Sequence, residues 1–541
     1  MCSNTVFNIN NLPLGLSDFS NIRESRMIYV DKTELISKIA RRRTPIFFSR
    51  PRRFGKSLLI NTLHSLFSKG LEDFCGLDLE KTWNDTTYKV VHIDFSGIAS
   101  RNSNSFIRAF TRRIIQQFKK NNKFSFSNSL CDEYPADVLD DICQHLDNNS
   151  VVLLIDEYDA PLTHHLDRPD ELQDIVEILN DFYAVAKQYT DKFRLIFITG
   201  VTRISHVSIF SAFNNIIDLS LKNEFNSLLG FTRKDLIQYF DQYIENAAFT
   251  LKISKNDVYK RLEQYYDGFQ FSIDAEETLY NPWSILSFFC NPQEGFYNYW
   301  FESGGRSSLI MQYLKINDSF DILNYQNRKI IKTKKELSAR YDITTVPKEI
   351  LLLQTGYFTI RKETNQIARL IFPNTEVEDS ILDLYLAANH IKFRDEIRYQ
   401  IDELSKNIDQ KNLPAIISVF NDILNDCVSI LSKIFDDERS VRDIIYAALP
   451  QEPYLQKIKE RETVKGFSDL EILTKKTRMV IEFKRTNPNR DAETSLQEAI
   501  KQIRDKNYGI VFFQNLELYR VAMVISSDDK AILPNFCMEV L

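Results

Sequence analysis

From Ile46 to Leu63 the chain reads IFFSRPRRFGKSLLINTL. The first four residues have the character of a buried β-strand, and the residues from Leu58 onward have that of an α-helix. The loop between them ends in Gly55-Lys56-Ser57, as phosphate-binding loops do. In such loops the backbone N–H groups at a helix N-terminus cradle phosphate oxygens, the lysine reaches the β- and γ-phosphates, and the hydroxyl coordinates Mg²⁺. The stretch therefore predicts a strand, a phosphate-binding loop and a helix.

One position departs from the pattern G-x-x-x-x-G-K-[ST], because Arg50 stands where the pattern has its first glycine. We expect the first tight turn of the loop to be made differently, with Pro51 contributing to it. Ser57 is an expected Mg²⁺ ligand. The loop residues that we expect to bind ATP are Arg52, Arg53, Phe54, Gly55, Lys56 and Ser57.

A second motif supports a nucleotide site. Residues 151–155 form an unbroken apolar run of the kind that is buried in a parallel sheet, and Asp156-Glu157 follow it at once. In this Walker B pattern Asp156 would bind the nucleotide and its Mg²⁺, and Glu157 would be the catalytic residue that polarises the attacking water. An isolated match of this kind more often reflects acidic residues that cap a turn. The co-occurrence of the two motifs favours the nucleotide site.

Further strands and helices alternate around these motifs. Residues 89–95 and 193–200 have strand character, and helical stretches near 104–120 and 170–188 separate the strands. This alternation is typical of a doubly wound parallel sheet. The fold class predicted for the N-terminal part is therefore α/β, with the parallel sheet of a P-loop NTPase.

Length and composition limit the class of protein. The chain has 541 residues, and at roughly 150 residues per domain this predicts three or four domains. Lysine and arginine total 68 against 74 for aspartate and glutamate, a net charge of −6, so there is no global basic field for sequence-independent nucleic-acid binding. Seven scattered cysteines without a C-x-x-C pair favour a reducing, cytoplasmic compartment. We expect neither an export signal nor a membrane span.

The middle of the chain is predominantly helical. Helices are predicted at 233–248 and 257–266, and Asn281-Pro282-Trp283 opens another. A helical lid over the nucleotide is the natural interpretation. The aromatic residues around 265–269 are more often core than base-stacking at this spacing. Residues 351–360 then predict the end of a helix, and a β-hairpin is expected around 363–366, which together indicate a winged-helix-like region.

The C-terminal part carries a second chemistry. Two strands are predicted at 466–473 and 478–484, and strand alternation places Glu482 and Lys484 on one face. A hairpin between the strands would bring Asp469 beside them. Two carboxylates that share Mg²⁺, with an adjacent lysine, are suited to phosphodiester hydrolysis: Asp469 and Glu482 would be metal ligands, and both would be catalytic together with Lys484. The alternative is a solvated hairpin with a same-face ion pair.

The N-terminal motifs resemble a known family. Residues 29–33, 50–57, 156–159, 200–204 and 210–215 look like the AAA-ATPase-like family, in which an arginine-rich loop is the usual form. The resemblance implies that the segment around residues 29–33 lies near the nucleotide base. It also implies that Arg203 belongs to the nucleotide site, where it would sense phosphate.

The C-terminal residues resemble the PD-(D/E)XK nuclease superfamily, and thus a restriction-endonuclease-like α/β domain. The resemblance rests on Asp469, on Glu482-x-Lys484 and on the helix expected at 494–506, with Gln497 and Gln502 near the site. Ser468 replaces the proline of the superfamily name. The resemblance implies a further acidic ligand, Glu438 or Glu462, and the sequence does not choose between them. The cations that we expect to attract phosphates are Lys457, Lys459, Arg461, Lys465, Lys475, Lys476, Arg478, Lys484, Arg485 and Arg490.

Together these features predict an ATP-binding and ATP-hydrolysing protein coupled to a Mg²⁺-dependent nuclease that acts on DNA or RNA. The expected parts are an AAA-ATPase-like domain at 1–229, a helical lid with a possible winged-helix region at 230–395, and a helical connection with the nuclease-like domain at 396–541. The alternative is an NTP-switch signalling or scaffold ATPase whose nuclease-like domain only binds nucleic acid or a protein partner. A homo-oligomer is compatible with either prediction.

Overall fold

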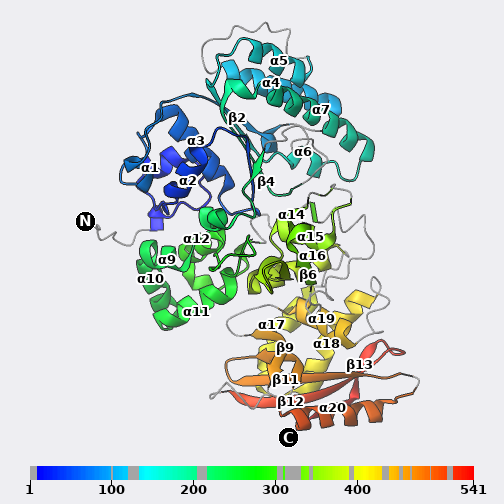
Figure 1. Cartoon of the computed structure of the whole chain (residues 1–541). Coiled ribbons are helices and arrows are strands. Elements are labelled where there is room, and N and C mark those ends of the chain that lie inside the picture. Colours follow the sequence, from blue (N-terminus) through cyan, green and yellow to red (C-terminus); the bar gives the residue numbers. More distant parts are fainter. Residues whose placement is uncertain are drawn as a thin grey trace. The chain divides into compact units, whose positions relative to one another are not determined.

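The computed structural model describes residues 9–98, 101–119, 133–203, 216–300, 309–310, 330–339, 341, 345–388, 395–428, 438–449, 455–463, 466–487, 489–508 and 516–540 (Figure 1). The chain divides into two compact units, one formed by residues 1–320 and 325–380 and the other by residues 321–324 and 381–541. The first unit contains the phosphate-binding loop, and the second contains the acidic hairpin.

The first unit contains the predicted parallel sheet, which is confirmed. Its five strands follow the order β2-β3-β4-β1-β5, and every neighbouring pair is parallel. All residues of β3 and β4 are buried, as expected for strands covered on both faces. The strands are β1 (Ile46–Ser49), β2 (Lys89–Asp94), β3 (Val151–Asp156), β4 (Phe193–Gly200) and β5 (Ile217–Asp218).

Helices cover both sides of this sheet. Figure 1 shows α1 to α3 on one side of the strands and α4, α5 and α7 on the other. Because the strands are parallel, their carboxyl ends meet at one edge, where ligands of such sheets bind. Ser49 pairs with Gly200 and Asp94 with Asp156, so the phosphate-binding loop starts at that edge. The helices are α1 (Phe19–Glu24), α2 (Thr33–Ala40), α3 (Lys56–Lys69), α4 (Ser103–Lys119), α5 (Pro135–Gln144), α6 (Ala160–Thr163) and α7 (Pro169–Gln188).

The predicted helical segment follows the sheet. Its helices are α9 (Arg233–Tyr239), α10 (Asp241–Leu251), α11 (Lys255–Tyr266) and α12 (Pro282–Cys290). One predicted helix is two in the structure, because α9 ends at Tyr239 and α10 begins at Asp241. The Asn281 side chain accepts hydrogen bonds from the backbone of the first turn of α12, which is the predicted start. The aromatic residues are mainly core, as predicted: Tyr266, Phe240 and Phe288 are fully buried in one cluster.

The winged-helix-like region forms a small three-stranded sheet with the order β6-β8-β7. Both neighbouring pairs are antiparallel, and the turn between β7 and β8 contains the residues 363–366 that the sequence assigned to it. In chain order the elements are β6 (Ile330–Thr333), α14 (Lys334–Ser338), α15 (Lys348–Thr355), β7 (Thr359–Lys362) and β8 (Ile367–Ile371). Residues Ile350 to Leu353 of α15 are buried, so this helix is a packing element of the first unit.

Glu376, near the start of α16 (Thr375–Ala388), makes the stability of the first unit depend on pH. Burial raises its pKa to about 8, although its carboxylate accepts hydrogen bonds from Ser284 Oγ at 2.7 Å and Trp300 N at 2.9 Å. The folded state therefore holds a proton that the unfolded chain releases near 4.5. This stabilisation is complete below 4.5 and is lost as the pH rises through about 8.

We expect the free energy of unfolding of the first unit to fall by about 4 kcal/mol across this pH window, and Glu376→Gln to remove that fall. Urea titrations followed by tryptophan fluorescence measure it, because Trp83, Trp283 and Trp300 all lie in this unit. Glu294→Gln removes an exposed carboxyl group and should keep the wild-type pH dependence. An unchanged pH dependence in Glu376→Gln would contradict the assignment.

The second unit is a mixed sheet with helices on both faces. The strand order is β13-β12-β11-β10-β9, in which β11 and β12 are parallel and the other neighbours antiparallel. Helix α20 packs on one face through a buried cluster that includes Val480 and Ala499, and Figure 1 shows α17 to α19 on the other. The elements are α17 (Asp395–Asp409), α18 (Leu413–Val428), α19 (Glu438–Ala448), β9 (Gln456–Thr463), β10 (Gly466–Leu473), β11 (Thr477–Arg485), α20 (Ala492–Lys506), β12 (Glu517–Ser526) and β13 (Ala531–Glu539).

Candidate functional sites

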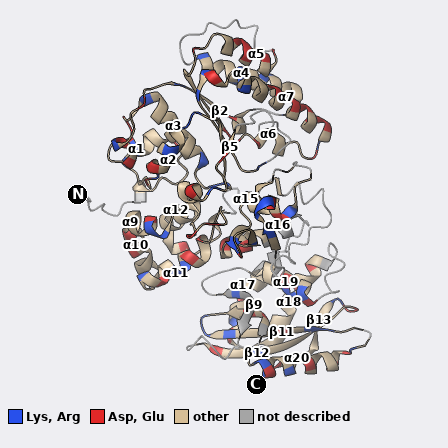
Figure 2. Cartoon of the chain, viewed as in Figure 1, with Lys and Arg blue, Asp and Glu red and all other residues tan. Residues whose placement is uncertain are grey.

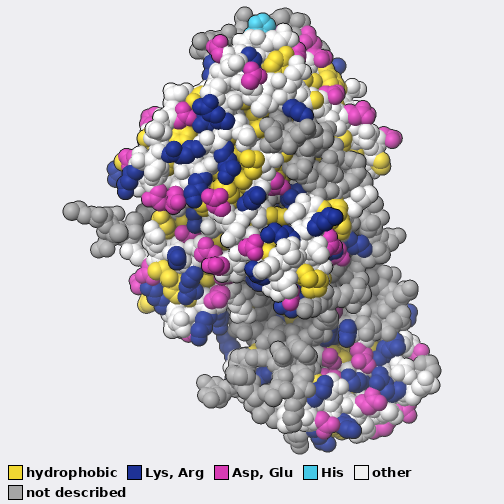
Figure 3. Space-filling model, viewed as in Figure 1, with side chains coloured by type: hydrophobic (Ala, Val, Ile, Leu, Met, Phe, Trp, Pro, Cys, Tyr) yellow, Lys and Arg dark blue, Asp and Glu magenta, His cyan; other side chains and the backbone are white. Residues whose placement is uncertain are grey.

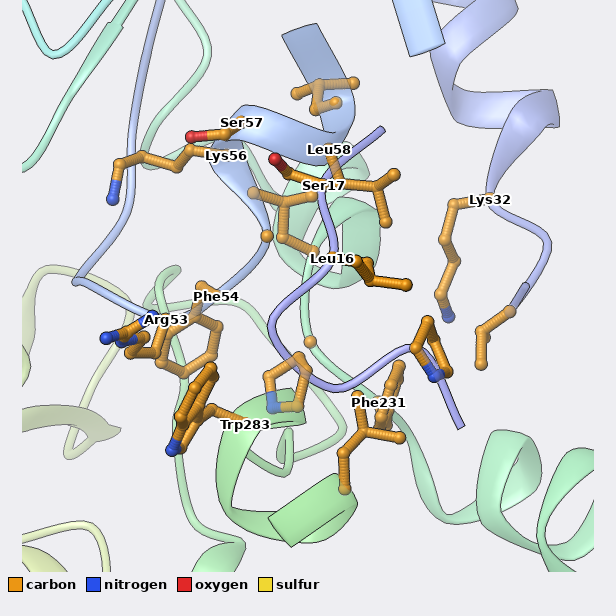
Figure 4. A pocket seen from close by; sticks show the side chains of 18 of the residues that line it. Leu16, Ser17, Lys32, Arg53, Phe54, Lys56, Ser57, Leu58, Phe231 and Trp283 are labelled. Atoms are coloured by element: carbon orange, nitrogen blue, oxygen red, sulfur yellow. The ribbon is translucent and has the colours of Figure 1, made fainter. Parts of the chain in front are cut away.

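A cavity of about 500 Å³ lies at the phosphate-binding loop. It is lined by the loop residues 52–57, by Glu157, by the N-terminal segments 13–17 and 28–32, and by the start of α12. In Figure 4 Lys56 and Ser57 lie at one end and Lys32 at the other. A cavity with a cationic helix N-terminus at one end and apolar walls is suited to a nucleotide.

The loop geometry follows from two residues. Gly55 precedes α3 with a φ of 96°, a left-handed conformation that favours glycine. Lys56 begins the helix, and its Nζ donates to the carbonyls of Arg50 and Pro51, both at 3.0 Å. Burial lowers the pKa of Lys56, whereas the nearby carboxylates of Asp156 and Glu157 raise it. The ammonium group thus lies within the loop that would hold the phosphates.

The structure brings the predicted acidic residues to the same place. Burial raises the pKa of Asp156 at the end of β3, and a hydrogen bond with the Ser57 side chain opposes that shift. Glu157 adopts a left-handed φ of 49° and lines the cavity, and burial raises its pKa as well. A serine hydroxyl and a carboxylate are hard oxygen ligands, so the pair Ser57 and Asp156 fits Mg²⁺ chemically.

Arg50, which stands where the loop pattern has its first glycine, has a structural role. Its side chain is only 2% exposed and lies between the rings of Phe48 and Phe271, 4.3 and 4.1 Å from their centroids. The guanidinium donates to the carbonyls of Ser49, Ser220 and Phe225 at 2.7 to 2.9 Å. The first turn of the loop is therefore held by a buried arginine. Pro51 contributes by packing against Gly356, where an added Cβ would lie 2.7 Å from the proline ring.

Arg50→Gly would restore the general loop pattern, yet we expect it to lower the free energy of unfolding by about 3 kcal/mol. Three carbonyls would lose a charged donor, and two aromatic rings would face a void. Urea titration followed by tryptophan fluorescence measures this loss. Arg43→Gly, in the exposed part of the preceding loop, is the matched control and should change stability by less than about 0.5 kcal/mol. Wild-type stability of Arg50→Gly would contradict this role.

Arg53 and Phe54 join the loop to the neighbouring helices. The Arg53 guanidinium lies 4.0 Å from the centroid of Trp283 on α12, and Figure 4 shows the two side chains together. Phe54 is buried and makes edge-to-face contacts with Phe269 and Phe271 at 4.9 and 5.2 Å. Both residues line the cavity. The contacts of their side chains described above are with other side chains of the protein.

The structure does not bring Arg203 to this cavity. Its Nη2 lies 2.8 Å from Asp218 Oδ2, its Nη1 donates to Leu337 O at 2.8 Å, and its Nη2 donates to Ser338 O at 3.2 Å. Arg203 therefore connects the end of β4 to the winged-helix-like region. The rest of the motif at 204–215 lies outside the described residues.

The Walker B segment and the end of β4 fit against each other. Asp159 Oδ2 accepts hydrogen bonds from Thr202 N at 2.7 Å and Thr202 Oγ1 at 2.6 Å. A Cβ at Gly200 would lie 2.5 Å from the ring of Tyr158 and 2.6 Å from Asp159, so only glycine fits this approach. The two segments are separate motifs in the sequence, and their contact explains why the glycine is needed.

The N-terminal segment that was expected near the base does line the cavity, through Tyr29, Val30 and Lys32. Lys32 Nζ lies 2.6 Å from Asp235 Oδ2 on α9, and Asp31 N of the same segment donates a hydrogen bond to the Tyr239 hydroxyl at 3.3 Å. The segment that lines the end of the cavity away from Lys56 is thus held by contacts with the first helix of the predicted lid.

The acidic hairpin of the second unit also places its polar residues together. Asp469 Oδ2 accepts a hydrogen bond from Phe483 N at 2.8 Å, and Lys484 Nζ lies 2.7 Å from Glu482 Oε1. Burial raises the pKa of Asp469, and burial together with the Asp469 charge raises the pKa of Glu482 to about 7. Glu482, Lys484 and Val480 share the face toward α20, as strand alternation predicted.

A buried carboxylate, Glu482, beside a half-buried one, Asp469, favours a bound cation. The side chain of Glu482 is 1% exposed, and its Oε2 has no hydrogen-bond partner among the described residues. No group of three or more His, Cys, Asp or Glu side chains positioned for a metal occurs in the described ranges. Mg²⁺ commonly takes one or two carboxylates and completes its shell with water. Asp469 and Glu482 therefore fit Mg²⁺ as its two protein ligands.

The sequence did not choose between Glu438 and Glu462 as the further acidic ligand, and the structure places one of them. Glu438 lies at the site, with Oε2 3.9 Å from Lys484 Nζ and with Oε1 accepting from Arg485 N at 2.7 Å. Glu462 belongs to β9, but its side chain lies outside the described part of the chain. The described structure thus places Glu438 beside the acidic pair.

Two residues near the acidic pair belong to none of the motifs in the sequence. Arg442 is 1% exposed, and its Nη1 lies 3.9 Å from Asp469 Oδ1. Tyr508 is fully buried, burial raises its pKa to about 12, and the charges of Glu482 and Asp469 raise it too. Its hydroxyl accepts a hydrogen bond from Gln502 at 3.1 Å, whereas Gln497 is exposed.

The expected basic cluster is smaller than its sequence suggests. Buried Lys457 donates to the carbonyl of Tyr446, in the last turn of α19, and to that of Leu449, just after the helix, and buried Arg478 pairs with Glu471 at 2.9 Å. These two cations are structural, and they do not face a substrate. Basic and acidic side chains are interspersed along the chain and on the face of the second unit that is shown (Figures 2 and 3). The side chains of residues 459, 461 and 465 lie outside the described residues.

Comparisons with known proteins agree with this arrangement. Residues 13–210 match the family model described as Predicted AAA-ATPase, and residues 436–533 match the PD-(D/E)XK nuclease superfamily. A protein of Azotobacter chroococcum mcd 1, described as "Uncharacterized protein in vnfD 5'region", is 29% identical over 395 residues, which cover 69% of this chain and 70% of that protein. None of the helices in the described ranges combines the length and hydropathy that a membrane span requires. The chain therefore carries matches to an AAA-ATPase-like domain model and to a PD-(D/E)XK nuclease superfamily model, in the order that the sequence resemblance implied.

Proposed function

We propose that this protein hydrolyses ATP in its first unit and cleaves phosphodiester bonds of DNA or RNA, with Mg²⁺, in its second. The observation that carries the nuclease proposal is the pairing of the half-buried Asp469 with the buried Glu482, with Lys484 2.7 Å from Glu482. The cavity at the phosphate-binding loop supports the ATPase proposal. A homo-oligomer in the cytoplasm is part of the proposal.

In the first unit, the backbone N–H groups at the start of α3 and the Lys56 ammonium would bind the phosphates. Ser57 and Asp156 would hold Mg²⁺, which neutralises charge on the β- and γ-phosphates when it is bound. Glu157 would orient the attacking water and accept its proton, and its burial, which raises its pKa, favours that role. The apolar end near Tyr29 and Val30 would receive the base.

In the second unit, Asp469 and Glu482 would hold Mg²⁺, which supplies an activated water and polarises the scissile phosphate when it is bound. The hydrogen bond from Phe483 N fixes one oxygen of Asp469. Lys484 would stabilise the negative charge that develops on the phosphate oxygens. The buried neighbours Arg442 and Tyr508 would hold the carboxylates in place.

The decisive experiment incubates the full chain with radiolabelled ATP and, separately, with plasmid DNA, single-stranded DNA and RNA. We expect phosphate release, and cleavage of at least one nucleic acid that requires Mg²⁺ and stops with EDTA. Binding of nucleic acid without any cleavage would favour the alternative, in which the second unit is a binding module of an NTP switch. Light scattering with and without ATP measures the assembly.

A further inference from the structure

Four arginines belong to the motifs of the nucleotide site, and three of them are committed to protein partners. Arg50 donates to three carbonyls inside the core. Arg53 lies over the ring of Trp283. Arg203 pairs with Asp218 and donates to two carbonyls of the winged-helix-like region. These side chains would have to break native contacts before they could reach a phosphate.

Arg52 differs from the other three. It is half-buried and lines the cavity together with Lys56, Ser57 and Glu157. Among the described residues its side chain has neither a hydrogen bond nor an ion pair. A cation held in a cavity without a counter-ion has an electrostatic reason to bind an anion there.

The neighbours of Arg52 indicate at which end of the cavity its side chain lies. Burial lowers the pKa of Lys56, and the charge of Arg52 lowers it further, so the two cations are near each other. Burial also lowers the pKa of His164, and Arg52 contributes to that shift. His164 follows α6, just beyond Glu157 and the end of β3. Arg52 therefore lies toward Lys56 and Glu157, the end that would hold the terminal phosphate.

We infer that Arg52 is a catalytic residue of ATP hydrolysis, a built-in arginine that contacts the γ-phosphate and stabilises its charge in the transition state. The inference rests on the ATP hydrolysis proposed above. In that step a water oxygen bonds to the γ-phosphorus while the bond to the bridging oxygen breaks, and its electron pair leaves with ADP. Glu157 accepts the water proton, and negative charge grows on the bridging and equatorial oxygens. An arginine offers several donors to such oxygens at once.

The test compares full-chain Arg52→Ala and Arg52→Lys with wild type and with Arg43→Ala, which removes an exposed arginine outside the cavity. We expect Arg52→Ala to lower kcat about 10³-fold and Arg52→Lys to recover part of that loss, because lysine keeps the charge but lacks the fork. Arg43→Ala should retain the wild-type kcat.

Calorimetric binding supplies a readout that does not depend on turnover. Arg52→Ala should weaken binding of ATPγS about 10-fold, with and without Mg²⁺, and leave the affinity for ADP within about twofold, because only the former has a γ-phosphate. Equal losses for both nucleotides, or a wild-type kcat in Arg52→Ala, would overturn the inference and leave the proposed ATPase intact. A wild-type protein that neither binds nor hydrolyses ATP would overturn both.

Discussion

Lys56→Ala is expected to lower ATP hydrolysis at least about 10³-fold and to weaken ATP binding about 10- to 100-fold. The lysine is the cation that begins α3, and its Nζ lies within the loop at 3.0 Å from the carbonyls of Arg50 and Pro51. A hydrogen bond to a charged group contributes roughly 1.5–3 kcal/mol, and stabilisation of charge in the transition state adds to that loss. Phosphate release and calorimetric titration with ATPγS measure the two effects.

The variant should remain folded, because the two carbonyls that lose a donor adjoin a cavity that water can enter. Tryptophan fluorescence reports on the folding of the same unit. Lys69→Ala is the matched control, since Lys69 lies in the last turn of α3 and pairs with Asp73 at 3.2 Å. It should hydrolyse ATP at the wild-type rate. Wild-type hydrolysis by Lys56→Ala would place the nucleotide site elsewhere.

Glu482→Gln is expected to abolish nucleic-acid cleavage, with a loss of at least about 10³-fold, and to leave the second unit at least as stable as wild type at pH 8. The amide cannot supply a negative charge to Mg²⁺, so metal binding should weaken together with cleavage. Gel assays across a Mg²⁺ titration measure the cleavage, and differential scanning calorimetry without metal measures the stability.

The stability expectation follows from the raised pKa. Burial and Asp469 raise the pKa of Glu482 to about 7, above the value of 4.5 in the unfolded chain. The protonated carboxyl therefore stabilises the fold fully below 4.5, and this contribution is lost as the pH rises through about 7. A neutral glutamine avoids the cost of a buried charge at pH 8. A cleavage-deficient but unfolded Glu482→Gln would contradict this explanation.

Two further variants test whether the loss of cleavage is specific to the proposed metal ligands. Glu493→Gln neutralises an exposed carboxylate at the start of α20 and should cleave like wild type. Asp469→Asn should lose cleavage to a similar extent, because both carboxylates are proposed to hold the same ion. Normal cleavage by Glu482→Gln or by Asp469→Asn would refute the proposed site, whereas loss of cleavage in Glu493→Gln would point to a different catalytic face.

Local patterns were sufficient for much of this architecture. The run from Val151 to Ile155 predicted a buried strand, and its apolar character alone requires burial on both faces. The order of residues 53–57 predicted a loop and a helix N-terminus, because phosphate binding depends on backbone geometry that a short segment can build alone. Alternation along β11 likewise predicted that Glu482 and Lys484 share a face.

Long-range packing decided what these patterns could not express. A sequence does not show that Arg50 would meet carbonyls at 220 and 225, or that Arg203 would pair with Asp218 rather than line the cavity. Nor does it show that Lys457 and Arg478 would be buried. Arginine and lysine have long side chains, so their targets depend on which distant segments the fold brings within reach.

The chain's own residue order therefore determined the two domain types, the loop, the strand that ends in Asp156 and the acidic hairpin, because each depends on neighbours a few residues apart. Only the folded structure assigned the charged side chains to the core or to a cavity. It separated Arg52 from three other arginines and placed Glu438 and Arg442 beside the carboxylate pair. The physical reason is that burial and counter-ions, which set the behaviour of a charge, come from residues far apart in the sequence.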